Sequence, residues 1–469
     1  MKIVTEKSNI SNQSESLNNS SESIKATRYA ILGMGVSGRA ACHFLLFKGA
    51  SVCGIDHNPH QLMVHPEIEP LIKLGLTLRE EKDIHELNQF DVIVVSPGIP
   101  LDHRLVKMAK QAKIRCIGEI ELGCQATHNP IIGITGTNGK TTVTLLITHV
   151  LNQCNQSAIA LGNVGAPLTK ELITLKEQTI VLELSSYQLE TLYQSCLESS
   201  AILNITPDHL DRYKTMVHYA QAKCQISNNI KPGHWLYVEE NVWKQYSHLL
   251  DPKVVRQYGY SPSSYISTDL LMVYQNGQIA FILPPSLQGK KSHDLENMLA
   301  AYAICADRGI KGPAFLKAWQ TFQKPPHRID LFITFKGIRF FDDSKGTNVD
   351  AVIRAVQSIE GPIILIAGGV DKNFPYHSWI EGFKDKVHHI FAIGEAAKKM
   401  HAQLSSNLPI TICNTLDNAV KQSIRLAQKG DNVLLSPGCS SFDMFRDYVH
   451  RGQEFQRIVR ELLQEEIII

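Results

Sequence analysis

The chain has 469 residues, of which 43% are hydrophobic and 20% are charged, and it carries a formal net charge of +2. This length exceeds one ordinary hydrophobic core, so we expect about two to four domains, and the small net charge gives no electrostatic reason to expect a nucleic-acid partner. Apolar runs such as Val92–Val95 are too short to cross a membrane, and ten scattered cysteines without a CxxC pair favour reduced thiols over disulfides or a zinc site.

The first 26 residues differ in composition from the rest of the chain. From Asn9 to Ser23 they are mostly Ser, Asn, Gln and Glu, which leaves little apolar surface to bury and predicts a disordered N-terminal extension over residues 1–26. The segment lacks the apolar core of a secretory signal, and its acidic residues argue against a transit peptide. We therefore expect a cytoplasmic protein whose extension has no catalytic role.

Residues 27–120 alternate between strand-like and helix-like segments. Tyr29–Leu32 and Ser51–Ile55 are apolar runs of strand length, and the glycine-rich turn Gly33–Gly38 and a helical segment lie between them. A further run, Asp91–Val95, stops at Ser96-Pro97-Gly98. This pattern predicts an open parallel sheet. The GxGxxG turn by itself fits an NAD-type cofactor, another diphosphate ligand or a purely structural tight turn, and all three stay open at this point.

A second α/β segment, residues 121–325, contains the strongest motif. Residues 130–142 have the sequence PIIGITGTNGKTT, an apolar strand followed by a Gly/Thr turn and an amphipathic helix. Such a turn surrounds phosphates with backbone N–H groups, and its lysine and threonine would contact the β/γ-phosphates and Mg²⁺. Ile134 stands where a strict Walker A motif has its first glycine. We predict an ATP site formed by Gly136, Thr137, Asn138, Gly139, Lys140, Thr141 and Thr142.

Three residues further along are candidates for phosphoryl-transfer chemistry. Glu183 is the one acid in the apolar run Thr179–Leu184, where a carboxylate is costly unless it is paired or bound to a metal, and Mg²⁺ prefers oxygen ligands. His209 follows the strand-like run Ala201–Thr206, and Lys223 lies in a helical segment. On residue type alone, His209 and Lys223 would be an ordinary loop histidine and a solvated lysine.

A third α/β segment occupies residues 326–469. It contains strand-like runs at Ile363–Ala367, Ile390–Ile393 and Asn432–Leu435. We therefore predict an α/β protein of three domains. Residues 27–120 would form a Rossmann-like domain, residues 121–325 a central P-loop ATPase-like domain, and residues 326–469 a second Rossmann-like domain.

The order and spacing of several motifs resemble those of the Mur ligase family. The loop variant GTNGKTT is found in this family and in its relative folylpolyglutamate synthetase, and LELSSYQLE at 182–190, NITPDHLDRY at 204–213 and AQAK at 220–223 follow it. The stretch LLSPGCSSFDMF at 434–445 resembles the branch that adds D-glutamate to UDP-N-acetylmuramoyl-L-alanine, and the DNPR sequence of the diaminopimelate-adding branch is absent. The resemblance extends from about residue 29 to the C-terminus.

This resemblance implies roles for individual residues. Thr141 and Glu183 would hold one Mg²⁺, and His209 and Lys223 a second, with Lys223 carbamylated because CO₂ turns its amine into an anionic oxygen ligand. The UDP precursor would contact Val36, Ser37, Asp56, Ser96 and Asn163. Further ATP contacts would be Asn297, His327, Arg328 and Asp343. D-Glutamate would meet Lys372, Ser441 and Phe442, and the catalytic set would be Lys140, Glu183, His209, Lys223 and Lys345.

The chain departs from the family pattern at two places. His57-Asn58 follow Asp56 where the UDP-binding domain commonly has an arginine or a similar polar residue, and Asp294 stands where the family commonly has asparagine. We therefore keep Asn297 alone as the adenine contact.

The implied activity is an ATP- and Mg²⁺-dependent amide-bond ligation. The muramoyl-alanine carboxylate would attack the γ-phosphorus of ATP, and the amine of D-glutamate would attack the resulting acyl phosphate. The implied partners are these small molecules, with no nucleic acid and no membrane, and a monomer is expected. Two alternatives remain: a folylpolyglutamate synthetase, which lacks a front-end domain like residues 29–120, and a non-catalytic homologue or nucleotide-cofactor oxidoreductase, in which the lysines and acids named above would be idle.

Overall fold

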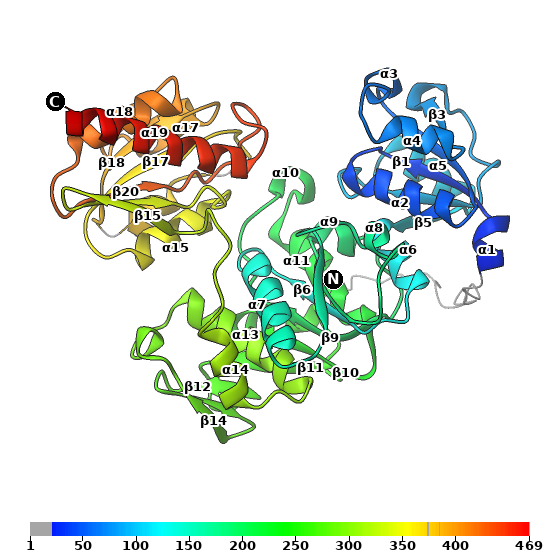
Figure 1. Ribbon diagram of the computed structural model, residues 1–469, viewed down its shortest axis with the longest axis horizontal. Coiled ribbons are helices and arrows are strands. Elements are labelled where there is room, and N and C mark those ends of the chain that lie inside the picture. Colours follow the sequence, from blue (N-terminus) through cyan, green and yellow to red (C-terminus); the bar gives the residue numbers. More distant parts are fainter. Residues whose placement is uncertain (1–20, 373–374, 384, 469) are drawn as a thin grey trace, which may run out of the picture. The chain divides into compact units, whose positions relative to one another are not determined.

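The computed structural model describes residues 21–372, 375–383 and 385–468 (Figure 1). The chain forms two compact units. The first comprises Met1–Ile132, Ser157–Glu198 and Asn228–Pro232, and the second comprises Gly133–Gln156, Ser199–Ser227 and Gly233–Ile469. Within the described ranges, no helix is long and apolar enough to cross a membrane. All ten cysteines are free thiols, as their scattered positions predict.

A five-stranded parallel sheet in the first unit has the strand order β3-β2-β1-β4-β5. Its strands are β1 (Arg28–Leu32), β2 (Ser51–Asp56), β3 (Thr77–Glu80), β4 (Val92–Val95) and β5 (Arg115–Gly118). The accompanying helices are α2 (Val36–Phe47), α3 (Pro59–Leu62), α4 (Ile68–Lys73), α5 (Arg104–Gln111) and α6 (Glu119–Ala126). Tyr29 and Ile31 pack into one buried cluster and Ala30 and Leu32 into another, because successive side chains of a strand point to opposite faces. The predicted open parallel sheet is confirmed.

Residues 21–26 form a short helix, α1 (Ser21–Ala26), so the disordered extension predicted for residues 1–26 is wrong for its last six residues. The side chain of Ile24 is partly buried against the apolar cluster that contains Tyr29 and Ile31. One isoleucine among polar residues gives no periodic pattern, which is why composition alone did not predict this helix. Residues 1–20, the rest of that prediction, lie outside the described residues.

The second sheet has nine strands in the order β14-β13-β12-β11-β10-β9-β6-β8-β7. Its strands are β6 (Ile131–Thr135), β7 (Ala158–Gly162), β8 (Thr179–Glu183), β9 (Leu197–Ile202), β10 (Ile230–Glu239), β11 (Val255–Gly259), β12 (Ile266–Thr268), β13 (Met272–Gln275) and β14 (Gln278–Ile282). Its helices are α7 (Lys140–Gln153), α8 (Leu168–Glu171), α9 (Ser186–Leu189), α10 (Leu210–Tyr213), α11 (Met216–Cys224), α12 (Glu240–Tyr246), α13 (His293–Asp307) and α14 (Gly312–Trp319). The α7 helix, which follows the predicted ATP loop, packs against α13.

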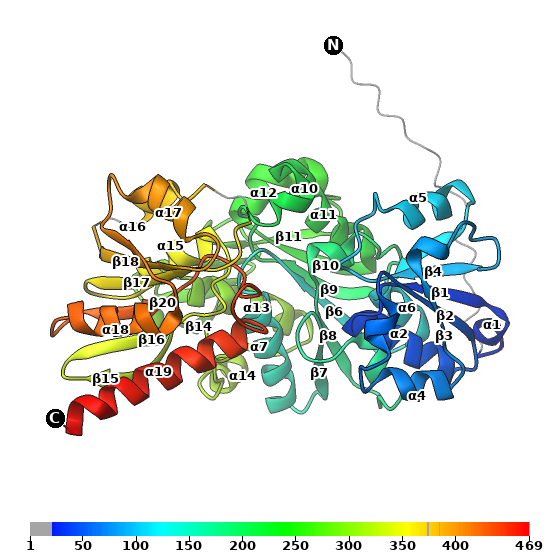
Figure 2. The same ribbon diagram turned by 90° about the horizontal axis from the view of Figure 1, so that it is seen from above.

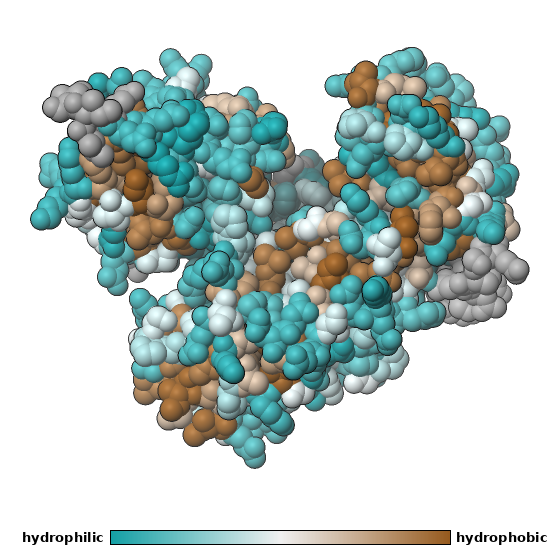
Figure 3. All heavy atoms as spheres, in the orientation of Figure 1, coloured by the Kyte–Doolittle hydropathy of each residue, from teal (hydrophilic) through white to brown (hydrophobic). Residues whose placement is uncertain are grey.

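The hairpin β13–β14 forms one edge of this sheet and is antiparallel, with an apolar surface. Ile279 and Ile282 of β14 are each 62% exposed, and Leu271 just before β13 is 52% exposed. Figure 3 shows hydrophobic atoms gathered in this region, beside β12 and β14 of Figure 1. The sequence predicted an α/β segment here without specifying this edge. The pair Asn276-Gly277, which joins the two strands with positive φ angles and favours a hairpin, was a signal left unused.

The third sheet belongs to the second unit and has the strand order β15-β16-β20-β17-β18-β19, antiparallel only between β15 and β16. Its strands are β15 (Asp330–Phe335), β16 (Ile338–Asp342), β17 (Ile363–Gly368), β18 (Val387–Ile393), β19 (Ile410–Ile412) and β20 (Asn432–Leu435). Its helices are α15 (Val349–Ser358), α16 (Ser378–Phe383), α17 (Ala397–Leu404), α18 (Leu416–Leu426) and α19 (Tyr448–Ile468). The three strand-like runs predicted in this segment are β17, β18 and β20.

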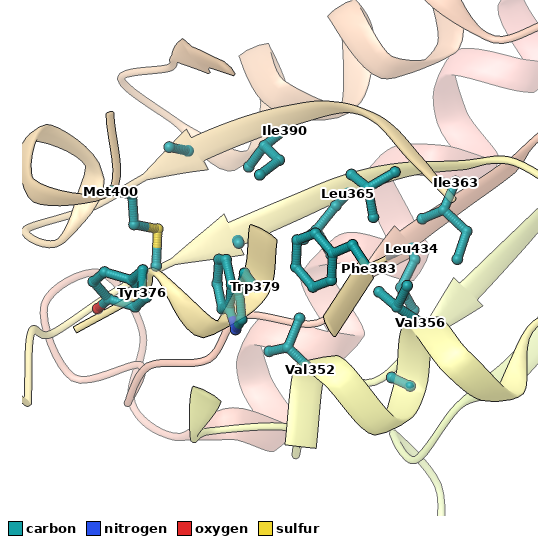
Figure 4. Packing of buried hydrophobic residues seen from close by; sticks show 14 of the residues in the cluster. Val352, Val356, Ile363, Leu365, Tyr376, Trp379, Phe383, Ile390, Met400 and Leu434 are labelled. Atoms are coloured by element: carbon teal, nitrogen blue, oxygen red, sulfur yellow. The ribbon is translucent and has the colours of Figure 1, made fainter. Parts of the chain in front are cut away.

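Helices cover both faces of the third sheet (Figure 2). On one face, Val352 and Val356 of α15, Trp379 of α16 and Met400 of α17 pack onto strand residues such as Leu365 (Figure 4). On the other face, helices α18 and α19 contribute a separate buried cluster. This two-layered cover fixes the position of α15, whose first turn matters for the site.

Candidate active site

The predicted ATP loop is the turn between β6 and α7 (Figure 1). Gly136 and Gly139 have φ angles of +152° and +88°, which L side chains rarely adopt. A Cβ on Gly139 would lie 2.5 Å from the side-chain oxygen of Asn297. Among the residues that the structure describes, no side chain caps α7. The backbone N–H groups of its first turn are thus available to a phosphate group.

Two of the predicted catalytic lysines hydrogen-bond to this loop. Lys140 Nζ donates to the carbonyl oxygens of Gly136 and Thr137, each at 2.8 Å. Lys345 Nζ donates to the hydroxyl of Thr141 at 2.7 Å. The predicted lysine of the loop, the predicted threonine and a lysine 204 positions further along the chain therefore meet at one place.

Lys223 reaches the same loop from helix α11. Its side chain is among the most buried in the protein, with 1% exposed, and its Nζ donates to the carbonyl oxygen of Gly136 at 2.8 Å. The amine also lies 4.8 Å from the centre of the Tyr219 ring, which is the range of a cation–π contact. Lys223 is therefore no solvated surface lysine, the interpretation that residue type alone favoured.

Asp208, His209 and Lys372 form a group of ionisable side chains beside these lysines. Lys372 Nζ lies 3.2 Å from Asp208 Oδ1, and His209 Nε2 lies 3.6 Å from Asp208 Oδ2. Burial opposes ionisation of Asp208, yet the positive charge of Lys372 holds the pKa of this carboxyl below its usual value. Burial, helped by nearby lysines and opposed by Asp208, lowers the pKa of His209 to about 4. His209 is therefore neutral at pH 7.

A cavity of about 250 Å³ opens beside the loop in the second unit. Ser292, Glu296, Lys324, Ala351 and Arg354 are among its lining residues. Asp294, which stands where the family commonly has asparagine, lines it too and forms an ion pair with Lys324 at 2.6 Å. Seven residues of the predicted site also line it, namely Asn138, Gly139, Thr142, Asn297, Arg328, Asp343 and Lys345.

Arg328 and Asp343 are two ionisable residues in the lining of this cavity. The Nε atom of Arg328 is buried and has no hydrogen-bond partner among the described residues, which is costly unless an acceptor enters the cavity. Burial raises the pKa of Asp343 to about 7, although Ser436 Oγ donates to its Oδ2 at 2.6 Å and Arg328 lies nearby. The carboxyl of Asp343 is therefore partly protonated near neutral pH.

His327 differs from the other predicted ATP contacts. Its ring is buried, its Nδ1 lies 2.6 Å from Asp342 Oδ2, and it is absent from the residues that line the cavity. Gln456 donates to the same oxygen of Asp342 at 2.8 Å. Asp342, the last residue of β16, therefore holds both His327 and Gln456 of helix α19.

The predicted D-glutamate residues lie on two neighbouring segments. Val370 and Ser440 form an isolated antiparallel bridge, with the N–H of Val370 donating to the Ser440 carbonyl at 3.0 Å. This bridge brings the segment of Lys372 beside that of Ser441 and Phe442. Ser441 is buried, whereas Phe442 is 73% exposed. A buried hydroxyl, a lysine and an exposed aromatic ring are thus available on these two segments.

In the first unit, four of the five predicted UDP residues, all but Asn163, follow β1 and β4 or end β2. The strands β1 and β4 are neighbours, although the chain passes through β2 and β3 between them, and ligands of open parallel sheets bind at such a reversal of strand order. Asp56 Oδ2 accepts the N–H of Met34 at 2.8 Å, and Ser96 Oγ donates to the carbonyl of Gly33 at 2.6 Å. A Cβ on Gly38 would lie 2.0 Å from the carbonyl oxygen of Gly33, so this glycine allows close packing of the turn.

The exposed first turn of α2 completes this group. Val36 is 66% exposed, Ser37 follows it, and Gly35 precedes the helix without a side-chain cap. The N–H groups of this turn are thus accessible to an anionic ligand.

Glu183 and Asn163 meet elsewhere in the first unit. Asn163 Nδ2 donates to Glu183 Oε1 at 2.6 Å, and β7 and β8 are parallel neighbours. Glu183 is 2% exposed, and its Oε2 has no hydrogen-bond partner among the described residues. A buried carboxylate oxygen without a partner is compatible with a bound cation. The described residues contain no group of three or more His, Cys, Asp or Glu side chains arranged to hold a metal ion.

Three polar residues near the loop were not predicted. Asp208 and Asn204 belong to the motif NITPDHLDRY, so their place after β9 was a signal that sequence reasoning left unused. Asp350, in the first turn of α15, contacts Asn138. No sequence signal indicates this contact, because 212 positions separate the two residues.

Three segments of the chain match family models. Residues 27–118 match the Mur ligase MurD-like, N-terminal domain, residues 134–305 the Mur ligase middle domain, and residues 327–439 the Mur ligase, glutamate ligase domain. The UDP-N-acetylmuramoylalanine–D-glutamate ligase of Protochlamydia amoebophila is 55% identical over 434 residues, which cover 92% of this chain and 97% of the relative. The protein of the same name from Thermoanaerobacter sp. is 35% identical over 455 residues, which cover 94% and 99%.

Among solved structures, a MurF ligase from Thermotoga maritima in complex with ADP has a similar fold. Its TM-score is 0.59 at 14% sequence identity, and the match covers 86% of this chain and 92% of that chain. The fold of the chain is thus one that solved ligases share.

Proposed function

Because this chain belongs to the Mur ligase family, we propose that it is an ATP-dependent ligase that adds D-glutamate to UDP-N-acetylmuramoyl-L-alanine. The identity of 55% to a relative of that name over 92% of the chain supports the choice of substrates. The observation that carries the chemistry is the meeting of Lys140, Lys223 and Lys345 at one glycine loop. The reaction would belong to cytoplasmic synthesis of peptidoglycan precursors.

The positive charges at the loop fit an acyl-phosphate mechanism. The carboxylate of UDP-N-acetylmuramoyl-L-alanine attacks the γ-phosphorus of ATP, the bond to the β,γ-bridging oxygen breaks, and ADP leaves. The amine of D-glutamate then attacks the acyl carbon, loses a proton, and expels phosphate. Lys140 and Lys345 stabilise the negative charge on the transferring phosphoryl group. Arg328, whose buried Nε has no partner in the described part of the chain, binds the nucleotide from the cavity side.

We assign the nucleotide and the two substrates to the residues that the sequence predicted for them. The loop residues 136–142 and Asn297 bind ATP, whereas Asp56 and Ser96 in the first unit bind the UDP precursor. Lys372 and Ser441 bind the side-chain carboxylate of D-glutamate, since a lysine and a hydroxyl are natural donors to it. Three domains, residues 27–120, 121–325 and 326–469, would each contribute one of these sites, in a monomeric enzyme.

We propose two Mg²⁺ ions, because the oxygen and nitrogen atoms at this site are ones that can hold Mg²⁺. Glu183 offers a buried carboxylate oxygen that has no partner among the described residues, Thr141 offers a hydroxyl, and neutral His209 offers a ring lone pair. Thr141 and Glu183 would hold one ion, and His209 with Lys223 the other. Bound Mg²⁺ supplies positive charge to the phosphate oxygens. Glu183→Gln should weaken Mg²⁺ binding in titration calorimetry with ADP present, independently of turnover.

Lys223 would serve as a metal ligand in its carbamate form. Its neutral amine attacks CO₂, a C–N bond forms, and one proton is released, which leaves an anionic oxygen donor. Burial of Lys223 supports this, because burial disfavours the charged ammonium form. Protein exposed to carbon-13-labelled CO₂ should give a carbamate resonance that Lys223→Arg lacks.

Turnover against a panel of amino acids tests the whole proposal. With ATP and UDP-N-acetylmuramoyl-L-alanine, phosphate release should require D-glutamate, and L-glutamate should be a poor substitute. Equal use of L-glutamate would favour the folate-type relative instead.

A further inference from the structure

Side-chain hydrogen bonds join the first turn of α15 to the predicted ATP loop, residues 136–142, hereafter the phosphate loop. Asn348 caps this helix, with its Oδ1 accepting the N–H of Ala351 at 2.8 Å. The Nδ2 of Asn348 donates to Asn138 Oδ1 at 3.1 Å. Asn348 is 3% exposed, so this contact is shielded from water. The cap of the helix thereby also holds a residue of the loop.

Asp350, two residues further on, gathers donors from three segments on one oxygen. Its Oδ2 accepts from Asn138 Nδ2 at 3.1 Å, from Thr206 Oγ1 at 3.1 Å and from Arg354 Nε at 2.6 Å. The three donors belong to the phosphate loop, the segment after β9 and α15 itself. Hydrogen bonds to an ionised acceptor are stronger than neutral ones.

The backbone N–H and carbonyl of Asn138 and both polar atoms of its side chain all form hydrogen bonds. Its backbone N–H donates to Asn204 Oδ1 at 2.8 Å, and its carbonyl accepts from Asn204 Nδ2 at 3.0 Å. Its side-chain amide is held by Asn348 and Asp350 from the other side. Asn138 cannot rotate without losing several of these bonds. The N–H groups of its neighbours in the loop are therefore fixed in direction.

We propose that Asp350 is a positioning residue that fixes the phosphate loop in its nucleotide-binding shape. Asp350 does not line the cavity, whereas Asn138 and Arg354, which it holds, both do. Arg354 Nη1 also contacts His293 Nδ1 at 2.8 Å, so the carboxylate orients a second group at the cavity wall. Preorganised donors bind an anion without the cost of ordering them first. This role rests on the proposed function, since it takes ATP as the ligand of the loop.

The test compares Asp350→Asn and Asp350→Ala with a control on another helix. Asp417 occupies the same position in α18, second after a side-chain cap, and it is exposed, so Asp417→Asn controls for loss of a carboxylate near a helix N-terminus. ATP binding is measured directly by titration calorimetry, and KM values are measured for ATP and for D-glutamate. Thermal unfolding without nucleotide reports any general loss of structure.

The expected result is selective. Asp350→Ala should raise the Kd for ATP by about tenfold or more, in line with the loss of hydrogen bonds to a charged group. The KM for D-glutamate should change by less than about twofold, and Asp417→Asn should match the wild type. In the Asn138→Ala background, Asp350→Ala should cost less ATP affinity than it does alone, because the two residues act through one contact.

Two results would overturn the role of Asp350. Unchanged ATP affinity in Asp350→Ala would do so, and so would equal losses in ATP affinity, D-glutamate use and thermal stability, which indicate a general structural role. If the wild-type protein itself bound no ATP, the proposed function and this role would fall together. A wild type that binds ATP with a variant that binds equally well would remove the role of Asp350 alone.

Discussion

Replacing Asp343 by asparagine should flatten the pH dependence of stability in the segment that contains the third sheet. The pKa of Asp343 is raised from 3.8 to about 7, chiefly by burial, in the folded state. Between these two values the folded chain holds a proton that the unfolded chain has released. The stabilisation from this carboxyl is therefore complete below about pH 4 and is lost as the pH rises through about 7.

The size of the effect follows from the two pKa values. The full difference corresponds to a loss on the order of 4 kcal/mol, at about 1.36 kcal/mol per pH unit. About half of it, roughly 2 kcal/mol, falls between about pH 5.5 and about pH 8. Asp343→Asn keeps the shape of the side chain and an oxygen that accepts the hydroxyl of Ser436, but it carries no titratable proton.

Urea unfolding can follow this segment alone. Trp379 is fully buried in the core of the third sheet and is the only tryptophan after residue 325. When Trp235, Trp243 and Trp319 are replaced by phenylalanine, the fluorescence of Trp379 reports this segment alone. Between about pH 5.5 and about pH 8, the protein that keeps Asp343 in this background should lose roughly 2 kcal/mol more of its free energy of unfolding than Asp343→Asn. Equal losses, within about 0.5 kcal/mol, would refute the assigned pKa and its cause in burial.

Other substitutions separate the proposed sites. Lys140→Ala should abolish ADP formation while the protein stays folded, and near-normal turnover of the soluble variant would contradict the ATP-loop assignment. Asp56→Ala should raise the KM for the UDP precursor far more than that for ATP; a selective rise in the ATP value would contradict the assignment of the first unit. Lys372→Ala should raise the KM for D-glutamate more than the KM for ATP or for the UDP precursor. Lys223→Ala should lose most activity and regain part of it with acetate or formate, whereas Lys223→Arg should stay inactive; a fully active arginine variant would rule out the carbamate.

The sequence was most informative where one short motif carries several of the expected ligand-binding residues. The motif at residues 136–142 predicted a turn that needs glycines, and Gly136 and Gly139 have positive φ angles. The role of these residues at ATP stays a prediction. The parallel strands were predictable because they are apolar runs bounded by turn residues. The short antiparallel hairpins β13–β14 and β15–β16 were not predicted, although Asn276-Gly277 and Lys336-Gly337 stand at their turns.

Contacts between distant segments lay beyond sequence reasoning. The ion pair of Asp208 with Lys372 and the bond of Asp350 to Asn138 each join residues more than 100 positions apart, and neither residue pair has a spacing rule. For His327, the sequence motif predicted a contact with ATP, whereas in the structure its ring contacts Asp342. Its role at ATP stays a prediction.

The central claim, that the chain joins D-glutamate to UDP-N-acetylmuramoyl-L-alanine at the expense of ATP, is tested most directly by the stoichiometry of the purified protein. Phosphate release and amide product should be followed together, with D-glutamate, L-glutamate or no amino acid added. The account predicts one phosphate for each D-glutamate joined, and little product with L-glutamate or without an amino acid. Product formation without ATP hydrolysis, or equal turnover of the two glutamate enantiomers, would contradict it.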